Sequence, residues 1–140
     1  MPPVEFRIRL DRRFRIPLLA FGVLRRNAWL RLDDESLLAR FGFFSLRIAL
    51  ADIDRWECQG PWRWWMAVGV RGTLGRPEIT FGGSRHGGVA LFLHRPIARW
   101  WWVRNLREVY FTLEDPDGFV TELAERGIHG RDARSAHQSV

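Results

Sequence analysis

The stretch AWLRLDDESLLARFGFFSLRIAL, residues 28–50, decides the fold because apolar and polar side chains alternate along most of it. Alternation with a period of two is typical of a strand with one buried face. The acidic cluster Asp33–Asp34–Glu35 interrupts the pattern, so residues 28–41 predict a β-hairpin closed by an acidic turn. After Gly42 a further strand is predicted, with four apolar side chains on one face: Phe44, Leu46, Ile48 and Leu50.

The same alternation continues on both sides of this stretch. Residues 5–10 predict a strand before it, and residues 51–59 predict a bent or bulged strand that ends at the Gly60–Pro61 break. Further strands are predicted at 65–70, 78–81, 88–93 and 108–113, and we expect 78–81 and 88–93 to pair as a hairpin.

Residues 11–24, DRRFRIPLLAFGVL, place a twin arginine before an apolar run. This arrangement loosely resembles a secretion signal, but Asp11, Pro17 and Gly22 interrupt it and no small-x-small cleavage site follows. The apolar run, residues 16–24, is far shorter than the about 20 residues that a membrane span needs. We therefore interpret it as a buried strand.

One helix is predicted, over residues 116–126. Asp115 is a good N-cap, Pro116 suits the first helical position, and Gly127 is the expected stop. Four side chains form one apolar stripe along this helix: Phe119, Val120, Leu123 and Ala124. Residues 128–140 carry almost no apolar side chains, so we expect a single domain over 1–127 and a disordered tail over 128–140.

Composition limits the kinds of site that the chain can build. A chain of 140 residues buries enough surface to fold without a metal or a disulfide. Cys58 is the single cysteine, which excludes an internal disulfide and a cysteine-cluster metal site and favours a reducing compartment. All 22 basic residues are arginine, and the net charge is +6. Residues 1–31 and 59–113 hold most of the excess, which favours negatively charged partners if folding brings the two blocks together.

Residues 28–57 resemble the core pattern of bacterial pleckstrin-homology-like (PH-like) domains: strand, acidic turn, strand ending at a glycine, then an Ile-x-Leu-x-Asp-Ile unit, here Ile48 to Ile53. The segment 14–126 is also similar to a group of small actinobacterial proteins, through Gly60–Pro61–Trp62–Arg63–Trp64 and the helix entry Asp115 to Phe119. The resemblance implies a mainly β fold, an antiparallel, partly open barrel of about seven strands capped by one C-terminal α-helix. It implies architecture rather than chemistry.

The residues that catalysis or metal binding would need are scattered. His86, His94, His129 and His137 occur singly, without the spacing of metal ligands. Asp52 and Asp54 flank Ile53 and have the chemistry of an acid–base pair or a cation site, but a bulge explains them without a substrate. We therefore expect no enzyme, no cofactor and no metal. The enzyme alternative requires a pocket where two or more of Asp52, Asp54, His86 and His94 converge.

Arg25 and Arg26 follow the first long strand region and are a candidate anion site. In eukaryotic pleckstrin-homology domains this loop often carries phosphoinositide headgroups, through a basic residue two positions before an arginine on the next strand. Here Trp29 precedes Arg31 at that spacing, so the motif is broken.

Tryptophan clusters with arginine in two places, residues 61–65 and 99–104. Because no regular element buries Trp100, Trp101 and Trp102 together, we expect one member of each cluster in the core and at least one indole at the surface. The candidate partner-binding residues are Trp62, Arg63, Trp64, Trp65, Arg99, Trp100, Trp101, Trp102 and Arg104. Exposed indoles beside arginines can form cation–π pairs, sit at a membrane interface, stack on nucleic acid bases or contact a protein.

These features predict a cytoplasmic, non-enzymatic binding or assembly module. Its expected partner is a protein, including a second copy of the chain, or the inner face of the membrane, contacted through the two Trp/Arg clusters. The alternatives are a nucleic-acid-binding protein that uses the basic blocks, and an enzyme with an unrecognised site.

Overall fold

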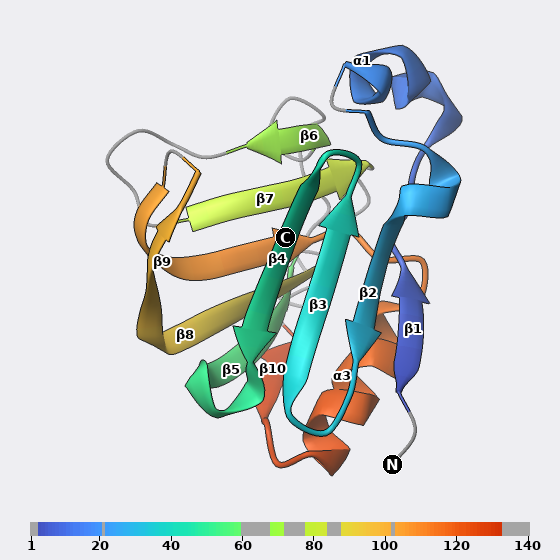
Figure 1. Cartoon of the computed structure of the whole chain (residues 1–140). Coiled ribbons are helices and arrows are strands. Elements are labelled where there is room, and N and C mark those ends of the chain that lie inside the picture. The colour runs from blue at the N-terminus through green and yellow to red at the C-terminus, as the bar shows by residue number, and fades with distance from the viewer. Residues whose placement is uncertain are drawn as a thin grey trace, which may run out of the picture.

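The computed structural model describes residues 3–20, 22–59, 68–71, 78–83, 88–101 and 103–132 (Figure 1). The first sheet has four strands in the order β1-β2-β3-β4: β1 (Val4–Arg7), β2 (Ala28–Leu32), β3 (Ser36–Phe41) and β4 (Phe44–Ala49). The second has six in the order β10-β5-β8-β9-β7-β6: β5 (Ile53–Gln59), β6 (Val68–Arg71), β7 (Glu78–Gly83), β8 (Gly88–Trp100), β9 (Val103–Phe111) and β10 (Gly130–Asp132). The described helices are η1 (Arg12–Phe14), α1 (Arg15–Leu19), η2 (Arg25–Asn27), η3 (Leu50–Asp52) and α3 (Pro116–Glu125).

The first sheet forms as its alternation predicts. Strands β2, β3 and β4 pair antiparallel in chain order, and alternate side chains face the core and solvent. The arginines of these strands are exposed, and all their leucines are buried except Leu38, which is half-buried on the same face as Arg31 and Arg47. The acidic turn is closed by Asp33, whose Oδ1 accepts hydrogen bonds from the backbone N–H groups of Glu35 and Ser36 at 2.8 and 2.7 Å. These donors, that of Glu35 first, hold the pKa of Asp33 below its ordinary value of 3.8.

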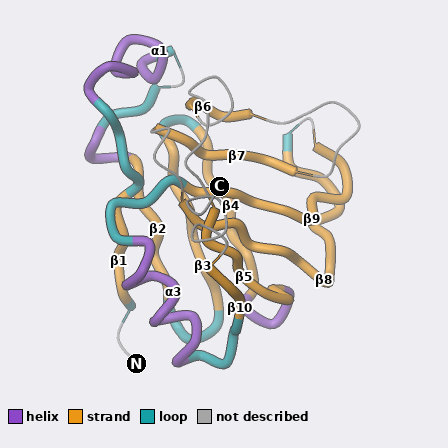
Figure 2. The backbone as a smooth tube through the Cα atoms, turned by 180° about the vertical axis from the view of Figure 1, so that it is seen from behind, coloured by secondary structure: helices purple, strands orange, loops and turns teal. Residues whose placement is uncertain are grey.

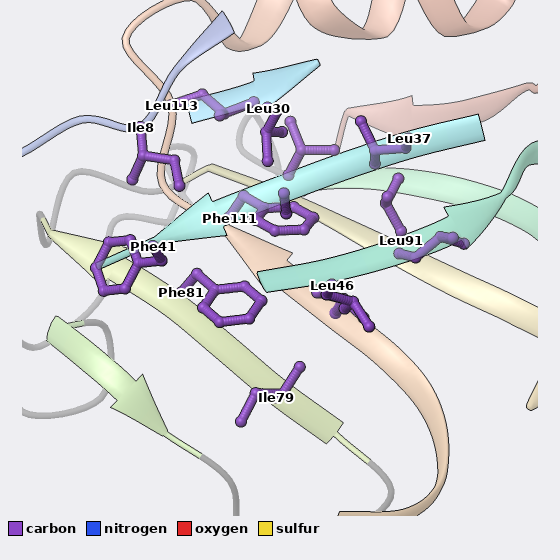
Figure 3. Packing of buried hydrophobic residues seen from close by; sticks show 14 of the residues in the cluster. Ile8, Leu30, Leu37, Phe41, Leu46, Ile79, Phe81, Leu91, Phe111 and Leu113 are labelled. Carbon is purple, nitrogen blue, oxygen red and sulfur yellow. The ribbon is translucent and has the colours of Figure 1, made fainter. Parts of the chain in front are cut away.

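One core lies between the two sheets (Figure 3). Phe41 of β3 meets Phe81 of β7 with ring centroids 5.7 Å apart, and Phe81 stacks on Phe111 of β9 at 5.5 Å. The sheets are also joined at an edge. Ile8 bridges to Leu113, and the backbone N–H of Arg9 donates to the carbonyl of Thr112 at 2.8 Å.

The predicted C-terminal helix is confirmed as α3. A carboxylate oxygen of Asp115 accepts from the backbone N–H of Gly118 at 3.0 Å, and Gly127 ends the helix at a φ of +86°. Phe119 and Leu123 are fully buried, with Phe119 edge-on to Phe6 of β1 at 5.2 Å. The helix therefore covers the first sheet near β1, as Figure 2 shows from behind.

The predicted fold, a partly open barrel of about seven strands with a capping helix, is confirmed only as a mainly β fold with one C-terminal helix. The chain is mainly β with a helix near its C-terminus, but the sheets do not close into a barrel and hold more strands than the expected seven. Two strand pairs are parallel, β7 with β9 and β10 with β5. The predicted hairpin of 78–81 with 88–93 is wrong, because β8 pairs with β5 and β9 and leaves β7 to add on the far side of β9.

Two other local predictions are wrong. Residues 12–19 form η1 and α1 rather than a strand, since Pro17 lacks the N–H that a ladder needs and its fixed φ suits the start of a helix. Residues 128–132 are not a disordered tail. Ile128 is buried, its carbonyl accepts from the Trp56 indole N–H at 3.1 Å, and β10 pairs with β5; residues 133–140 lie outside the described residues.

Candidate interaction surface

The β8–β9 hairpin is bent, and the bend carries its tip to the first sheet. Phe92 of β8 pairs with Glu108 of β9, and the next paired residues are Ile97 and Leu106. Between these two pairs the chain advances five residues along β8 but only two along β9, so β8 contains a bulge. Extra residues on one strand bend it and increase its twist, and Pro96, which has no N–H, fits such a place. Asn105 on the facing strand has a φ of +52°. In Figure 1 the two strands sweep upward at the left edge as a result.

Trp100 fixes the tip of this hairpin against β4. Its side chain is only 7% exposed, and its Nε1–H donates to the carbonyl of Ser45 at 2.8 Å. Its ring lies edge-on to Phe81 at 5.4 Å and near Phe44 at 5.8 Å. Of the two described tryptophans of the second cluster, Trp100 is the one that enters the core, so it supports the hairpin tip rather than forming its exposed surface.

Trp101 faces solvent. Its side chain is 57% exposed, one side of the indole rests near the Phe44 ring at 4.9 Å, and its backbone has a φ of +50°. That left-handed conformation is uncommon for a bulky residue and turns Trp101 away from the sheet while Trp100 points in. The prediction that at least one indole lies at the surface is confirmed.

Two arginines flank the exposed indole as direct cross-strand partners. Arg99 of β8 pairs in register with Arg104 of β9, and both are exposed. Like charges directly opposite in a ladder repel. Neither has an ion-pair partner among the described residues, and the sequence from 94 to 107 holds four arginines and no acid. The tip is therefore a concentrated positive charge beside an exposed aromatic ring.

The remaining candidate residues are placed only in part. Trp62, Arg63, Trp64, Trp65 and Trp102 lie outside the described residues. Of the proposed anion site, Arg26 is exposed on η2, whereas the side chain of Arg25 is not described. Sequence reasoning missed further exposed hydrophobic residues, namely Ile16, Leu19, Leu24 and Phe43. The signal for the first three was the apolar run after the arginine pair, which we took to be buried.

The residues of the enzyme alternative are described only in part, and Asp52 is half-buried in η3. Asp54 pairs with Arg55 at 2.8 Å, His94 is exposed on β8, and His86 lies outside the described residues. An open groove of about 430 Å³ lies elsewhere, between Arg9, Leu10, Asp11, Arg12 and Glu114. Its Arg9 already pairs with Asp11 at 3.4 Å. Within the described residues, no three His, Cys, Asp or Glu side chains form a group that could hold a metal ion.

Charge is segregated between two ends of the molecule. The β2–β3 turn with Asp33, Asp34 and Glu35 lies beside α3, which Arg126 ties to it through a 3.2 Å bond to the carbonyl of Asp33. The cap and helix α3, residues 115–125, add four acids and no arginine. In Figures 1 and 2 the tip of the β8–β9 hairpin and α1 lie toward the opposite end.

Comparisons of the chain with models of protein families, with curated proteins and with solved structures found no match. In the part of the chain that the structure describes, no helix has the length and apolar character that crossing a membrane requires. The surface is therefore interpreted from its own residues.

Proposed function

We propose that this chain is a non-enzymatic docking module of PH-like architecture that attaches to the anionic inner face of the cytoplasmic membrane through the tip of the β8–β9 hairpin. The order of a four-stranded antiparallel sheet, a second sheet and a capping helix supports the PH-like part, together with the pattern of residues 28–57. The observation that carries the docking part is the facing pair Arg99–Arg104 beside the exposed Trp101.

An anionic surface relieves the repulsion within this arginine pair. Each arginine near a membrane of anionic lipids contributes about 1 kcal/mol of attraction, and guanidinium groups bind phosphate oxygens bidentately. An indole is most stable at the boundary between headgroups and acyl chains, where its ring is apolar and its N–H is hydrated. The tip therefore combines the two kinds of side chain that a membrane–water interface favours.

Charge segregation supports the same orientation. The hairpin segment holds arginines without acids, whereas α3 and the β2–β3 turn are acidic. A protein with such a dipole approaches a negative surface with its positive end first. The acidic end then points toward solvent, away from the lipid.

The test is co-sedimentation with vesicles. Wild-type protein is expected to bind vesicles of phosphatidylcholine and phosphatidylglycerol in a two-to-one mixture and to leave pure phosphatidylcholine vesicles unbound. The double variant Arg99→Gln/Arg104→Gln should bind the mixed vesicles about 30-fold more weakly, which corresponds to two contributions of about 1 kcal/mol. The control Arg55→Gln/Arg131→Gln removes the same formal charge from β5 and β10, where these arginines pair with Asp54 and Glu57 at 2.8 and 3.2 Å, and should keep most of the binding.

Three results would contradict the proposal. One is a wild-type protein that stays in the supernatant with both kinds of vesicle. Another is an equal loss of binding in the two double variants, which would indicate net charge rather than a site. The third is tight, salt-sensitive binding of single-stranded oligonucleotides that survives excess anionic vesicles, which would favour the nucleic-acid alternative. A stable complex between copies of the chain without vesicle binding would favour a protein partner.

A further inference from the structure

The short helix α1 turns apolar side chains to opposite sides. Ile16 and Leu19, three residues apart and hence on one face, are 81% and 50% exposed. Phe14, Leu18 and Val23 are buried and attach the segment to the core. Exposing apolar side chains to water costs free energy. Exposed apolar side chains that lie together on an ordered segment are therefore typical of a binding surface.

The segment is held in this position by its own hydrogen bonds. The backbone N–H groups of Gly22 and Val23 donate to the carbonyls of Leu19 and Leu18 at 2.9 and 3.0 Å. The Asn27 side chain accepts from the N–H of Leu24 at 2.7 Å and donates to the carbonyl of Gly22 at 3.0 Å. Ile16 and Leu19 are therefore displayed by a defined structure.

Phe43 continues this apolar face toward the hairpin tip. It lies in the β3–β4 turn, is 74% exposed, and its ring covers Gly22, whose φ is +71°. A Cβ added at Gly22 would lie 2.6 Å from the Phe43 ring. Next to it in sequence, Phe44 contacts Trp101. We call Ile16, Leu19, Phe43 and Trp101 the apolar rim; Figure 1 shows that α1, the β3–β4 turn and the hairpin tip lie away from α3.

Charge decides which occupant fits the rim. Residues 12–28 contain five arginines, Arg12, Arg13, Arg15, Arg25 and Arg26, and no acid. A second copy of the same surface would bring like charges together, whereas a bilayer with anionic lipids offers phosphate to the arginines and an apolar interior to the rim. Basic residues around an apolar face are the pattern of segments that lie in the membrane interface.

We infer that α1 and Phe43 form a second membrane contact, so that the chain docks on two points: the hairpin tip and the segment 12–24. The inference rests on the proposed function and adds the part of the surface that enters the lipid most deeply. Ile16, Leu19 and Phe43 insert into the boundary between headgroups and acyl chains, while the exposed Arg12 and Arg26 remain at the level of the phosphates. Two separated contacts fix the tilt of the molecule on the membrane.

Site-specific labels test this arrangement in the full chain. Ile16→Cys and, as the control at the acidic end, Glu125→Cys each carry an environment-sensitive fluorophore; Cys58 is buried and is not labelled in the folded protein. With the mixed anionic vesicles, the label at position 16 should shift to shorter wavelength and be quenched by lipids with nitroxide in the upper acyl chain. The label at position 125 should do neither.

A binding measurement accompanies the labels. The double variant Ile16→Ser/Leu19→Ser changes only exposed side chains and should fold normally, yet bind the mixed vesicles about tenfold more weakly because less apolar area leaves water. If wild type binds, but this variant binds equally well and the label at 16 stays in water, α1 is not a contact and the proposed function stands. A label at 125 that shifts as much as that at 16 also overturns the inference. If wild type does not bind at all, both proposals fail.

Discussion

Trp100 and Trp101 are neighbours in sequence, but the first side chain is buried and the second is exposed. The sequence predicts that the three adjacent indoles cannot share one face, but it does not say which one is buried. That choice depends on the register of β8 and β9, where Trp100 pairs with Val103 and the chain turns at Trp101. The register is set by the bulge near Pro96, which no local pattern specifies.

Replacing each indole by phenylalanine should separate the two roles. Trp100→Phe removes the N–H that satisfies the Ser45 carbonyl and leaves space in the core, so the free energy of unfolding should fall by about 1–3 kcal/mol. Trp101→Phe changes an exposed side chain and should alter stability by less than about 0.5 kcal/mol. Urea titration followed by circular dichroism measures both. Equal destabilisation of the two variants would contradict the assignment of Trp100 to the core.

Asp33 makes the stability of the fold depend on pH in the acidic range. Its pKa is lowered in the folded state by the N–H donors of Glu35 and Ser36, so the ionised side chain stabilises the fold above pH 3.8, and this stabilisation is lost as pH falls through the lowered pKa. Asp33→Asn should therefore flatten the fall of Tm on acidification below about pH 4. Glu35→Gln, which removes a charge from the same turn but leaves the Asp33 bonds intact, should keep the wild-type slope. Parallel Tm–pH curves for wild type and Asp33→Asn would contradict this role.

At the scale of elements, local sequence signals predict which helices and strands form but not which strands pair with each other. The cap Asp115, the first-turn Pro116 and the stop at Gly127 are signals within one helix, and α3 follows them. The partner of β7 is β9, more than 20 residues further along the chain, and a loop sequence between β7 and β8 carries no information on that choice. The C-terminal strand was missed for the same reason, since its side chains are exposed and its pairing with β5 rests on the backbone, supplemented by one surface contact of Arg131 with Glu57 at 3.2 Å.

The strand β10 depends on a glycine. A Cβ at Gly130 would collide with the carbonyl of Trp56, so Gly130→Val should separate β10 from β5 and lower the free energy of unfolding by about 2 kcal/mol or more. Arg131→Ala, at the adjacent position, is the control: it removes only the exposed ion pair with Glu57 and should cost less than about 1 kcal/mol. Hydrogen exchange of the backbone amides in β5 should rise in Gly130→Val alone. A variant as stable as wild type would show that β10 does not contribute.

At the scale of the molecule, the two sheets share one hydrophobic core. The buried cluster contains residues from both, and the contact between Phe41 and Phe81 crosses from one to the other. The pattern of residues 28–57 could predict the first sheet and a mainly β chain, and the run of three tryptophans could predict that an indole lies at the surface. The charge segregation could not be predicted from the sequence, because it depends on which turns and helices the tertiary fold brings together at each end of the molecule.

Cooperative unfolding is the expected consequence of the shared core. Urea transitions followed by far-ultraviolet circular dichroism and by tryptophan fluorescence, whose indoles include Trp29 of the first sheet and Trp56 and Trp100 of the second, should coincide. Phe81→Leu should move both curves to lower urea together, by about 1 kcal/mol in free energy of unfolding. Two separated transitions would show that the sheets unfold independently.

The left-handed backbone at Trp101 has a practical consequence for anyone who engineers this chain. A glycine adopts that conformation without the steric cost of a Cβ, which is about 1 kcal/mol, so Trp101→Gly should make the turn easier to form. The same change deletes the indole that the turn displays. A library screened for heat resistance alone would therefore enrich variants whose hairpin is more stable but lacks the exposed indole. A parallel screen for vesicle binding would identify these variants, because they gain stability and lose binding.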